Sequence, residues 1–114
     1  MKVDTTQIDT IYSFAEVMPQ YPGGDPAMMD FIRKNIVFPE SVHDREVFGA
    51  TTYVEYVVEK DGQVSNVKPL KNPNSDIAKQ LVRIVKTFPK YSPGKIDRKP
   101  VRVRMMVPLR INLQ

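Results

Sequence analysis

The C-terminal end of the chain carries the most regular alternation of apolar and polar side chains. Every odd position from Val101 to Leu113 is apolar. The even positions are Arg102, Arg104, Met106, Pro108, Arg110 and Asn112. Because side chains alternate between the two faces of a strand, this period predicts one long strand whose odd-numbered side chains face a core and whose even-numbered side chains face outward. Proline cannot donate to a ladder, so Pro108 places part of this strand at a sheet edge.

Two further strands are predicted upstream of this one. Residues 51–59 are rich in alternating β-branched and aromatic side chains, and residues 63–70 form a returning strand. Asp61-Gly62 lies between the two segments. Both residue types tolerate positive φ, which a type I′ turn requires, so the sequence predicts a tight β-hairpin with that turn.

An apolar stripe at helical spacing predicts a first helix, which Pro39 ends. The stripe consists of Met28, Phe31 and Ile32, continued by Asn35 and Ile36. Asp25 can accept hydrogen bonds from the free amides of a first turn and Pro26 suits the first helical position, so we expect the helix to start there. The preceding Tyr21-Pro22-Gly23-Gly24 lacks the glycine spacing of a phosphate-binding loop and is interpreted as a turn into the helix.

A second helix is predicted after the turn at residues 72–75, where Asn74 or Ser75 can cap it. Its apolar side consists of Ile77, Leu81, Ile84, Val85 and Phe88, and Pro89 stops it. The order helix, hairpin, helix, strand predicts an α+β fold. Two helices are expected to cover one face of a small antiparallel sheet of three or slightly more strands.

Length and composition describe one domain with few groups suited to catalysis. A chain of 114 residues can build one modest core. It has no cysteine, which excludes thiolate nucleophiles and cysteine zinc sites, and the single His43 cannot complete a zinc set. Glu55 and Glu59 are interpreted as solvated strand charges, not as an acid/base pair. We therefore expect no enzyme activity, no catalytic residue, no metal and no cofactor.

Charge is distributed unevenly along the chain. Residues 1–62 hold 5 basic and 11 acidic side chains, whereas residues 63–114 hold 12 basic and 2 acidic ones. Either the charges mix on one folded surface, or the second part presents a basic face to an acidic partner or a nucleic acid. The arginine row of the last strand could meet phosphates, but that strand contains no aromatic side chain for base stacking. Nucleic acid is therefore not the expected partner, and the row is also suited to discouraging indiscriminate strand pairing.

Eight short motifs in a fixed order resemble the C-terminal domain of TonB energy-transducing proteins, in the form common in Bacteroidetes-type bacteria. They are Tyr21-Pro22-Gly23-Gly24, Asn35-Ile36-Val37-Phe38-Pro39, Gly49 before a strand, Asp61-Gly62-Gln63-Val64, Arg83-Ile84-Val85-Lys86, Phe88-Pro89-Lys90-Tyr91-Ser92-Pro93-Gly94, Lys99-Pro100-Val101 and Pro108-Leu109-Arg110-Ile111-Asn112-Leu113. The resemblance covers Pro19 to Leu113. It divides the chain into residues 1–18, a linker or possible extra edge strand, and residues 19–114, the TonB-like domain.

The resemblance implies a periplasmic binding module that transduces energy for nutrient uptake. In that family the domain grips an extended segment, the TonB box, of an outer-membrane transporter by adding it beside the last strand. The contacts implied here are the even positions from Arg102 to Asn112, with Lys90 and Tyr91 in the neighbouring loop. The family also reaches inner-membrane motor proteins through a membrane helix and a proline-rich spacer. Neither appears in this sequence, so that connection would need a tether outside it.

A stand-alone secreted or periplasmic domain with a structural or homo-oligomeric role is the alternative interpretation. Residues 11–17 are β-capable and precede the TonB-like region. They could lie on the free edge of the last strand, in their own chain or in a neighbour's. We therefore expect the free protein either to occupy this edge itself or to form a homodimer through it. The resemblance further implies that Tyr21 packs on the core.

Overall fold

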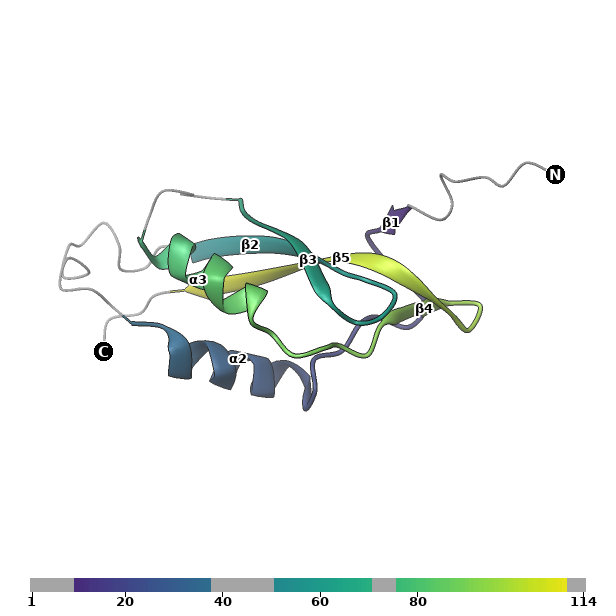
Figure 1. Cartoon of the computed structure of the whole chain (residues 1–114), viewed down its shortest axis with the longest axis horizontal. Coiled ribbons are helices and arrows are strands. Elements are labelled where there is room, and N and C mark those ends of the chain that lie inside the picture. The colour runs from purple at the N-terminus through teal and green to yellow at the C-terminus, as the bar shows by residue number, and fades with distance from the viewer. Residues whose placement is uncertain (1–9, 38–50, 71–75, 111–114) are drawn as a thin grey trace.

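The computed structural model describes residues 10–37, 51–70 and 76–110, and every structural statement below concerns these ranges. Two helices and five strands make up the described fold. They are β1 (Ile11–Tyr12), α2 (Gly24–Asn35), β2 (Thr51–Val58), β3 (Val64–Pro69), α3 (Asp76–Lys86), β4 (Gly94–Ile96) and β5 (Lys99–Arg110). Both helices pack on one face of the sheet (Figure 1), which confirms the predicted α+β fold.

The sheet has the strand order β1-β5-β2-β3, and β4 pairs with β5 beside this path. β5 pairs antiparallel with β2, and β2 pairs antiparallel with β3. These three strands are the predicted antiparallel core. β1 adds a short parallel pairing, and β4 forms a hairpin with the start of β5, so the sheet is mixed. β2 pairs only with residues 103–110 of β5, so the start of β5 extends beyond β2.

The core lies between the helices and the inward side of the sheet. Val103 and Val107 of β5 are 0% and 1% exposed, in agreement with the alternation of its sequence. The other elements contribute Met28, Ile32, Val54, Tyr56, Val58, Leu81, Ile84 and Val85, all buried. Burying one such aliphatic side chain contributes about 1.5–3 kcal/mol, so the inward positions of β5 hold this strand to the fold. Met106 and Pro108, at even-numbered positions, are exposed on the opposite face of this strand.

The turn between β2 and β3 differs from the prediction. The hairpin is present, but only Gly62 has positive φ (89°), so a type I′ turn at Asp61-Gly62 is wrong. The Gly62 amide donates to the Glu59 carbonyl at 2.8 Å, and the Glu59 amide donates to the Gln63 carbonyl at 2.8 Å. These bonds close a three-residue loop that ends in a left-handed glycine. The Gln63 amide donates to the Asp61 carboxylate at 2.9 Å, which fixes Asp61 inside this loop.

α2 begins two residues before the predicted start. The Gly24 amide donates to the Tyr21 carbonyl at 2.7 Å, and Gly23 has φ 87° and ψ 0°, the values of the third residue of a type II turn. This turn directs the chain into the helix at Gly24, with Gly23 as N-cap and no side-chain cap. Capping by Asp25 is therefore wrong. Pro26 is tolerated because first-turn amides have no partner within a helix.

β4 and its turn were not predicted. Ile96 pairs with Lys99, so the β4–β5 hairpin is closed by the two residues Asp97 and Arg98. Their φ values are 52° and 66°, and positive φ at both central positions defines a type I′ turn. The chain thus uses this turn type without glycine, one hairpin later than expected. Predictions for Pro39, His43, Asn74 and Ser75 fall outside the described residues.

Candidate functional site: an open flank of β5

One side of β5 lacks a described strand partner over most of its length. Val103 pairs with Val58 of β2 and also with Tyr12 of β1, so β1 and β2 lie on opposite sides of β5. β2 continues along its side as far as Arg110. On the side of β1, no described strand pairs with β5 beyond Val103. We call this side of β5, from Arg104 to Arg110, the open flank.

The direction of the main-chain groups of β5 follows from the hydrogen bonds of β2. The Leu70 amide donates to the Tyr53 carbonyl at 2.9 Å, so the main chain of Tyr53 points toward β3 and away from β5. Tyr53 pairs with Pro108, which is therefore a position that makes no ladder bond to β2. Because the direction alternates along a strand, the residues that present main-chain groups to the open flank are Arg104, Met106, Pro108 and Arg110.

Two of the three prolines in the described strands, Pro69 and Pro108, occupy equivalent positions in this pattern. Pro108 faces the open flank, so its missing amide costs no bond to β2. Leu70 of β3 is hydrogen-bonded to Tyr53 of β2, and Pro69 is the residue next to Leu70. Because the direction alternates along a strand, Pro69, which pairs with Val54, has its main chain facing away from β2. Both prolines are thus tolerated where proline is usually found in sheets, at outward-facing edge positions. The open flank offers the amides of Met106 and Arg110, with a gap at Pro108, whereas the amide of Arg104 faces the carbonyl of Tyr12 in β1.

The outward face beside the open flank carries a row of charges. Arg104 Nε lies 3.4 Å from Glu55 Oε1, and Lys68 Nζ lies 3.2 Å from Glu55 Oε2. The single carboxylate of Glu55 thus pairs with two cations, so this group of three side chains on β2, β3 and β5 has a net charge of one positive unit. Met106 is 52% exposed on the same face and adds an apolar contact surface. The side chains at the flank therefore combine a cation with an exposed thioether.

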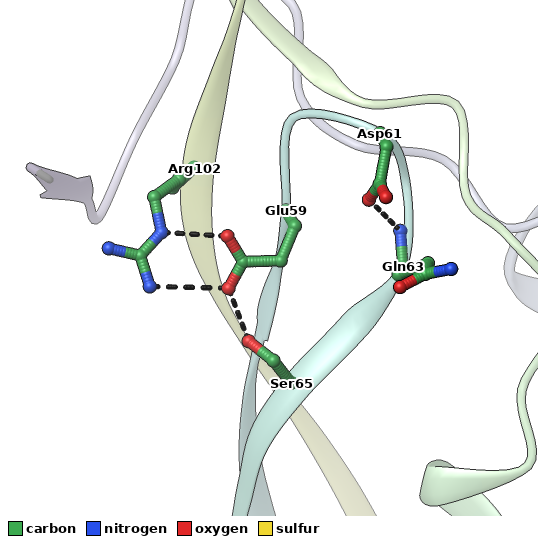
Figure 2. A network of polar contacts seen from close by, with 5 residues as sticks. All are labelled: Glu59, Asp61, Gln63, Ser65 and Arg102. Atoms are coloured by element: carbon green, nitrogen blue, oxygen red, sulfur yellow. Dashed lines mark hydrogen bonds and ion pairs between the residues drawn. The ribbon is translucent and has the colours of Figure 1, made fainter. Parts of the chain in front are cut away.

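A second ion pair, between Arg102 and Glu59, lies at the upstream end of this face (Figure 2). Arg102 donates from Nε to Glu59 Oε1 at 2.8 Å and from its Nη2 to Oε2 at 3.2 Å, and the Ser65 hydroxyl also donates to Glu59. Partial burial by itself would raise the pKa of Glu59. The hydrogen bonds from Arg102 and Ser65 and the charge of Arg102 outweigh it, so the pKa of Glu59 lies below its usual value. Glu59 is thus an ion-paired link between strands, not the solvated charge expected from the sequence.

The predicted contact residues fall into three groups. Arg104, Met106 and Pro108 lie together on the exposed part of β5, at the open flank. Arg102 belongs to the Glu59 pair at the upstream end. Arg110 of β5 pairs through its main chain with Thr51 of β2, and Asn112 lies outside the described residues.

The loop candidates Lys90 and Tyr91 are separated by burial. Lys90 is exposed, but Tyr91 is only 5% exposed. Its hydroxyl lies 2.6 Å from that of Tyr56 and 3.5 Å from Met28 Sδ. Burial raises the pKa of both tyrosine hydroxyls, to about 12 for Tyr56, so both stay neutral. Tyr91 thus serves the core and is left out of the proposed site.

Tyr91 belongs to an aromatic cluster beneath the sheet. Tyr21 contacts Phe88 and Tyr91 edge to face at centroid distances of 5.2 and 5.6 Å. Tyr21 itself is 6% exposed, which places it in the core as the resemblance implied. Such pairs add about 0.5–1.5 kcal/mol each beyond the area they bury. The cluster fixes the loop before β4, and with it the start of β5.

Two structural checks concern other kinds of function. The described ranges contain no group of three or more His, Cys, Asp or Glu side chains that could hold a metal ion. Neither described helix is long and apolar enough to cross a membrane.

The comparison with protein families matches residues 34–113 to the model for the C-terminal domain of Gram-negative bacterial TonB proteins. No curated protein and no solved structure shows a significant match to the chain. Domains of this family are non-catalytic and transport-associated, lie in the periplasm and generally interact with outer-membrane transporters. The matched segment contains β2, β3, α3, β4 and β5, including the open flank. The chain therefore belongs to the TonB C-terminal domain family.

Proposed function

We propose that this domain binds an extended segment of an outer-membrane transporter, the TonB box, by adding it as a strand along the open flank. The observation that carries the proposal is the row of main-chain groups from Arg104 to Arg110 that faces away from β2. An incoming strand pairs with such groups irrespective of its sequence, and its alternate side chains supply selectivity. Arg104 and Met106 are the described side chains that such a strand would meet on the outward face.

The rigid support of β5 favours this role. Its inward residues Val103 and Val107 are held in the core, and Arg102 is tied to Glu59 across the sheet. A flank held in this way loses little conformational entropy when a partner strand binds. In the periplasm, and with a connection to inner-membrane motor proteins, the bound strand would carry force to the transporter. Energy transduction for nutrient uptake is the biological role proposed here.

Amide hydrogen exchange of the full chain tests the proposal. The probe is a synthetic peptide that copies the N-terminal plug segment of an outer-membrane transporter. On saturation, the amide of Met106 should exchange more slowly, while those of Met105 and Val107, already bonded to β2, should change little. The matched controls are two forms of the same peptide, N-methylated either at the odd-numbered or at the even-numbered residues. Every second amide of the peptide would face β5, so one of the two forms loses its donors to β5 and should not bind, whereas the other should still bind.

Two outcomes of this experiment would contradict the proposal. Protection confined to α2 or α3 would place the peptide elsewhere and reject the open flank as the site. Protection of Met106 that rises with protein concentration and needs no peptide would assign the flank to a second copy of the chain. That result would favour the structural or homo-oligomeric role over energy transduction.

A further inference from the structure

β1 occupies the upstream end of the same side of β5. Ile11 pairs with Arg102 and Tyr12 pairs with Val103, in parallel. The chain then leaves β5, because Ala15 is 2% exposed within the fold and Val17 pairs with Lys95 of β4. β1 therefore ends where the open flank begins.

The segment after β1 is firmly attached to the domain. Val17 and Lys95 exchange two main-chain hydrogen bonds of 3.0 and 2.8 Å, and Gln20 and Ser92 exchange two of 3.0 and 2.9 Å. The Glu16 carboxylate also accepts a hydrogen bond of 2.7 Å from the amide of Asp97. With this anchor, β1 stays next to β5 even when it is undocked, at a high effective concentration.

β1 and a partner strand draw on one continuous set of main-chain groups. Arg102 is an even-numbered residue of β5, so it faces the same side as Arg104 and Met106. A partner strand that bonds only to the carbonyl of Arg104 and to the residues beyond it leaves β1 in place. A longer strand that also pairs with Arg102 has to displace β1, because each main-chain position can be paired by one strand at a time.

We propose that β1 is a built-in competitor that limits how much of β5 a partner strand can pair with. The inference rests on the proposed function and adds its regulation. The contact is suited to displacement, since it consists of two parallel residue pairs and both β1 side chains are only half-buried. Parallel pairing is also slightly less stable per residue than antiparallel pairing. Transporter segments are thus distinguished by length, as only longer ones gain from releasing β1.

The size of the effect follows from the docked fraction of β1. If β1 is docked in about 90% of molecules, a peptide that needs the vacated position binds about tenfold more weakly than to a chain without the competitor. A peptide confined to residues 104–110 shows no such difference. The comparison of two peptide lengths therefore separates competition from a general change of the domain.

Two variants of the full chain set β1 free or fix it. Ile11→Gly with Tyr12→Gly weakens the strand and removes its side-chain contacts. Ile11→Cys with Arg102→Cys introduces the only cysteines of the chain at directly paired positions, so oxidation locks β1 onto β5 and reduction releases it. Substitutions are preferred to truncation because Ala15 and Val17 belong to the folded body.

Peptide affinities are measured by fluorescence anisotropy. The short peptide copies about six residues of a transporter plug segment, and the long peptide has about four more residues at each end. These lengths follow from the spacing of residues along a strand. The long peptide should bind the glycine variant about tenfold tighter than the native chain. The oxidised cysteine variant, in which β1 cannot leave, should bind the long peptide more weakly than the reduced form does and no more tightly than it binds the short peptide. The short peptide should bind the native chain and the glycine variant equally, and it should bind the oxidised and reduced forms of the cysteine variant equally. Long-peptide affinities within twofold of one another would overturn the competition while leaving the proposed function intact. If neither peptide binds any form of the protein, the proposed function is overturned, and this inference with it.

Discussion

Met105 and Met106 form a matched pair for testing the direction of the main-chain groups in β5. Met105 pairs with Tyr56 and, as an odd-numbered residue, donates its amide to β2. Met106 points its amide to the open flank. Replacing either methionine with proline removes one amide from the same strand, one residue apart. Pro108 already shows that a proline fits β5 at a flank-facing position.

The expected magnitudes differ in kind. Met106→Pro removes one potential bond to a partner strand, worth about 1 kcal/mol net, or about a fivefold increase in the Kd of the peptide. The fold should lose little, because that amide bonds to no described strand. Met105→Pro leaves the carbonyl on β2 without its donor inside the sheet, at a cost of about 1–3 kcal/mol. For a domain of this size, each kcal/mol lowers the Tm by roughly 4 °C or slightly more.

Peptide titration measures the loss of binding, and thermal unfolding followed by circular dichroism measures the loss of stability. Met106→Ala is the control that removes the exposed side chain and keeps the amide. Met106→Pro should bind the peptide more weakly than Met106→Ala at nearly the same Tm, and Met105→Pro should have a clearly lower Tm. Equal losses of Tm in the two proline variants would show that the assigned direction of β5 is incorrect. Equal peptide affinities of Met106→Pro and Met106→Ala would remove the Met106 amide from the binding site.

Three further substitutions test other parts of the structure. Gly62→Ala should lower the free energy of unfolding in urea by about 2 kcal/mol or more, because Gly62 has φ 89° and an added Cβ would overlap the Tyr91 carbonyl oxygen; a change under about 0.5 kcal/mol, the level of a neutral surface substitution, would contradict this close approach. Glu59 has a lowered folded-state pKa, so its stabilisation is fully present above its unfolded pKa, about 4.3, and is lost as pH falls through the folded value. Unfolding of Glu59→Gln should therefore depend less on pH below about pH 5, and an unchanged slope would refute the assignment. Val107→Asp should leave the domain unfolded by NMR, because this 1% exposed position cannot solvate a charge, whereas Met106→Asp should stay folded.

The alternation in the sequence was sufficient to predict the faces of β5. Val103 and Val107 are buried and Arg104 and Met106 exposed, because a period of two is imposed by local strand geometry alone. The apolar spacing that places Leu81 on the inward side of α3 was predictable for the same reason, since helical geometry is also local.

The open flank itself could not be derived from that pattern. The side-chain period decides which face of the sheet a residue occupies, but the direction of its amide depends on the register with β2, which appears only when Tyr53 and Pro108 are seen to pair. β1 and β4 are too short to show any period. The turn at Asp97 and Arg98 lacks the glycine that usually marks positive φ, so sequence reasoning had no signal for it.

Sequence reasoning also misjudged how the loop before β4 is used. Tyr91 follows two exposed residues in a proline-containing loop, a setting that suggests a surface position. Its burial results from contacts with residues distant in the chain, among them Tyr56 and Tyr21. Tertiary contacts of this kind leave no trace in local spacing.

The positions of Pro69 and Pro108 affect how copies of this domain behave at high concentration. β3 and β5 present the outer sides of the sheet's main strands, and Pro69 in β3 and Pro108 in β5 each lack an amide on the outward side. Two copies that meet edge to edge through β3 would encounter Pro69, and two that meet through the open flank would encounter Pro108, so no long uninterrupted ladder can grow between them. A short extended ligand on the open flank meets only the single gap at Pro108. Crowded molecules of the domain should therefore stay soluble and remain receptive to a brief extended guest, without assembling into fibres.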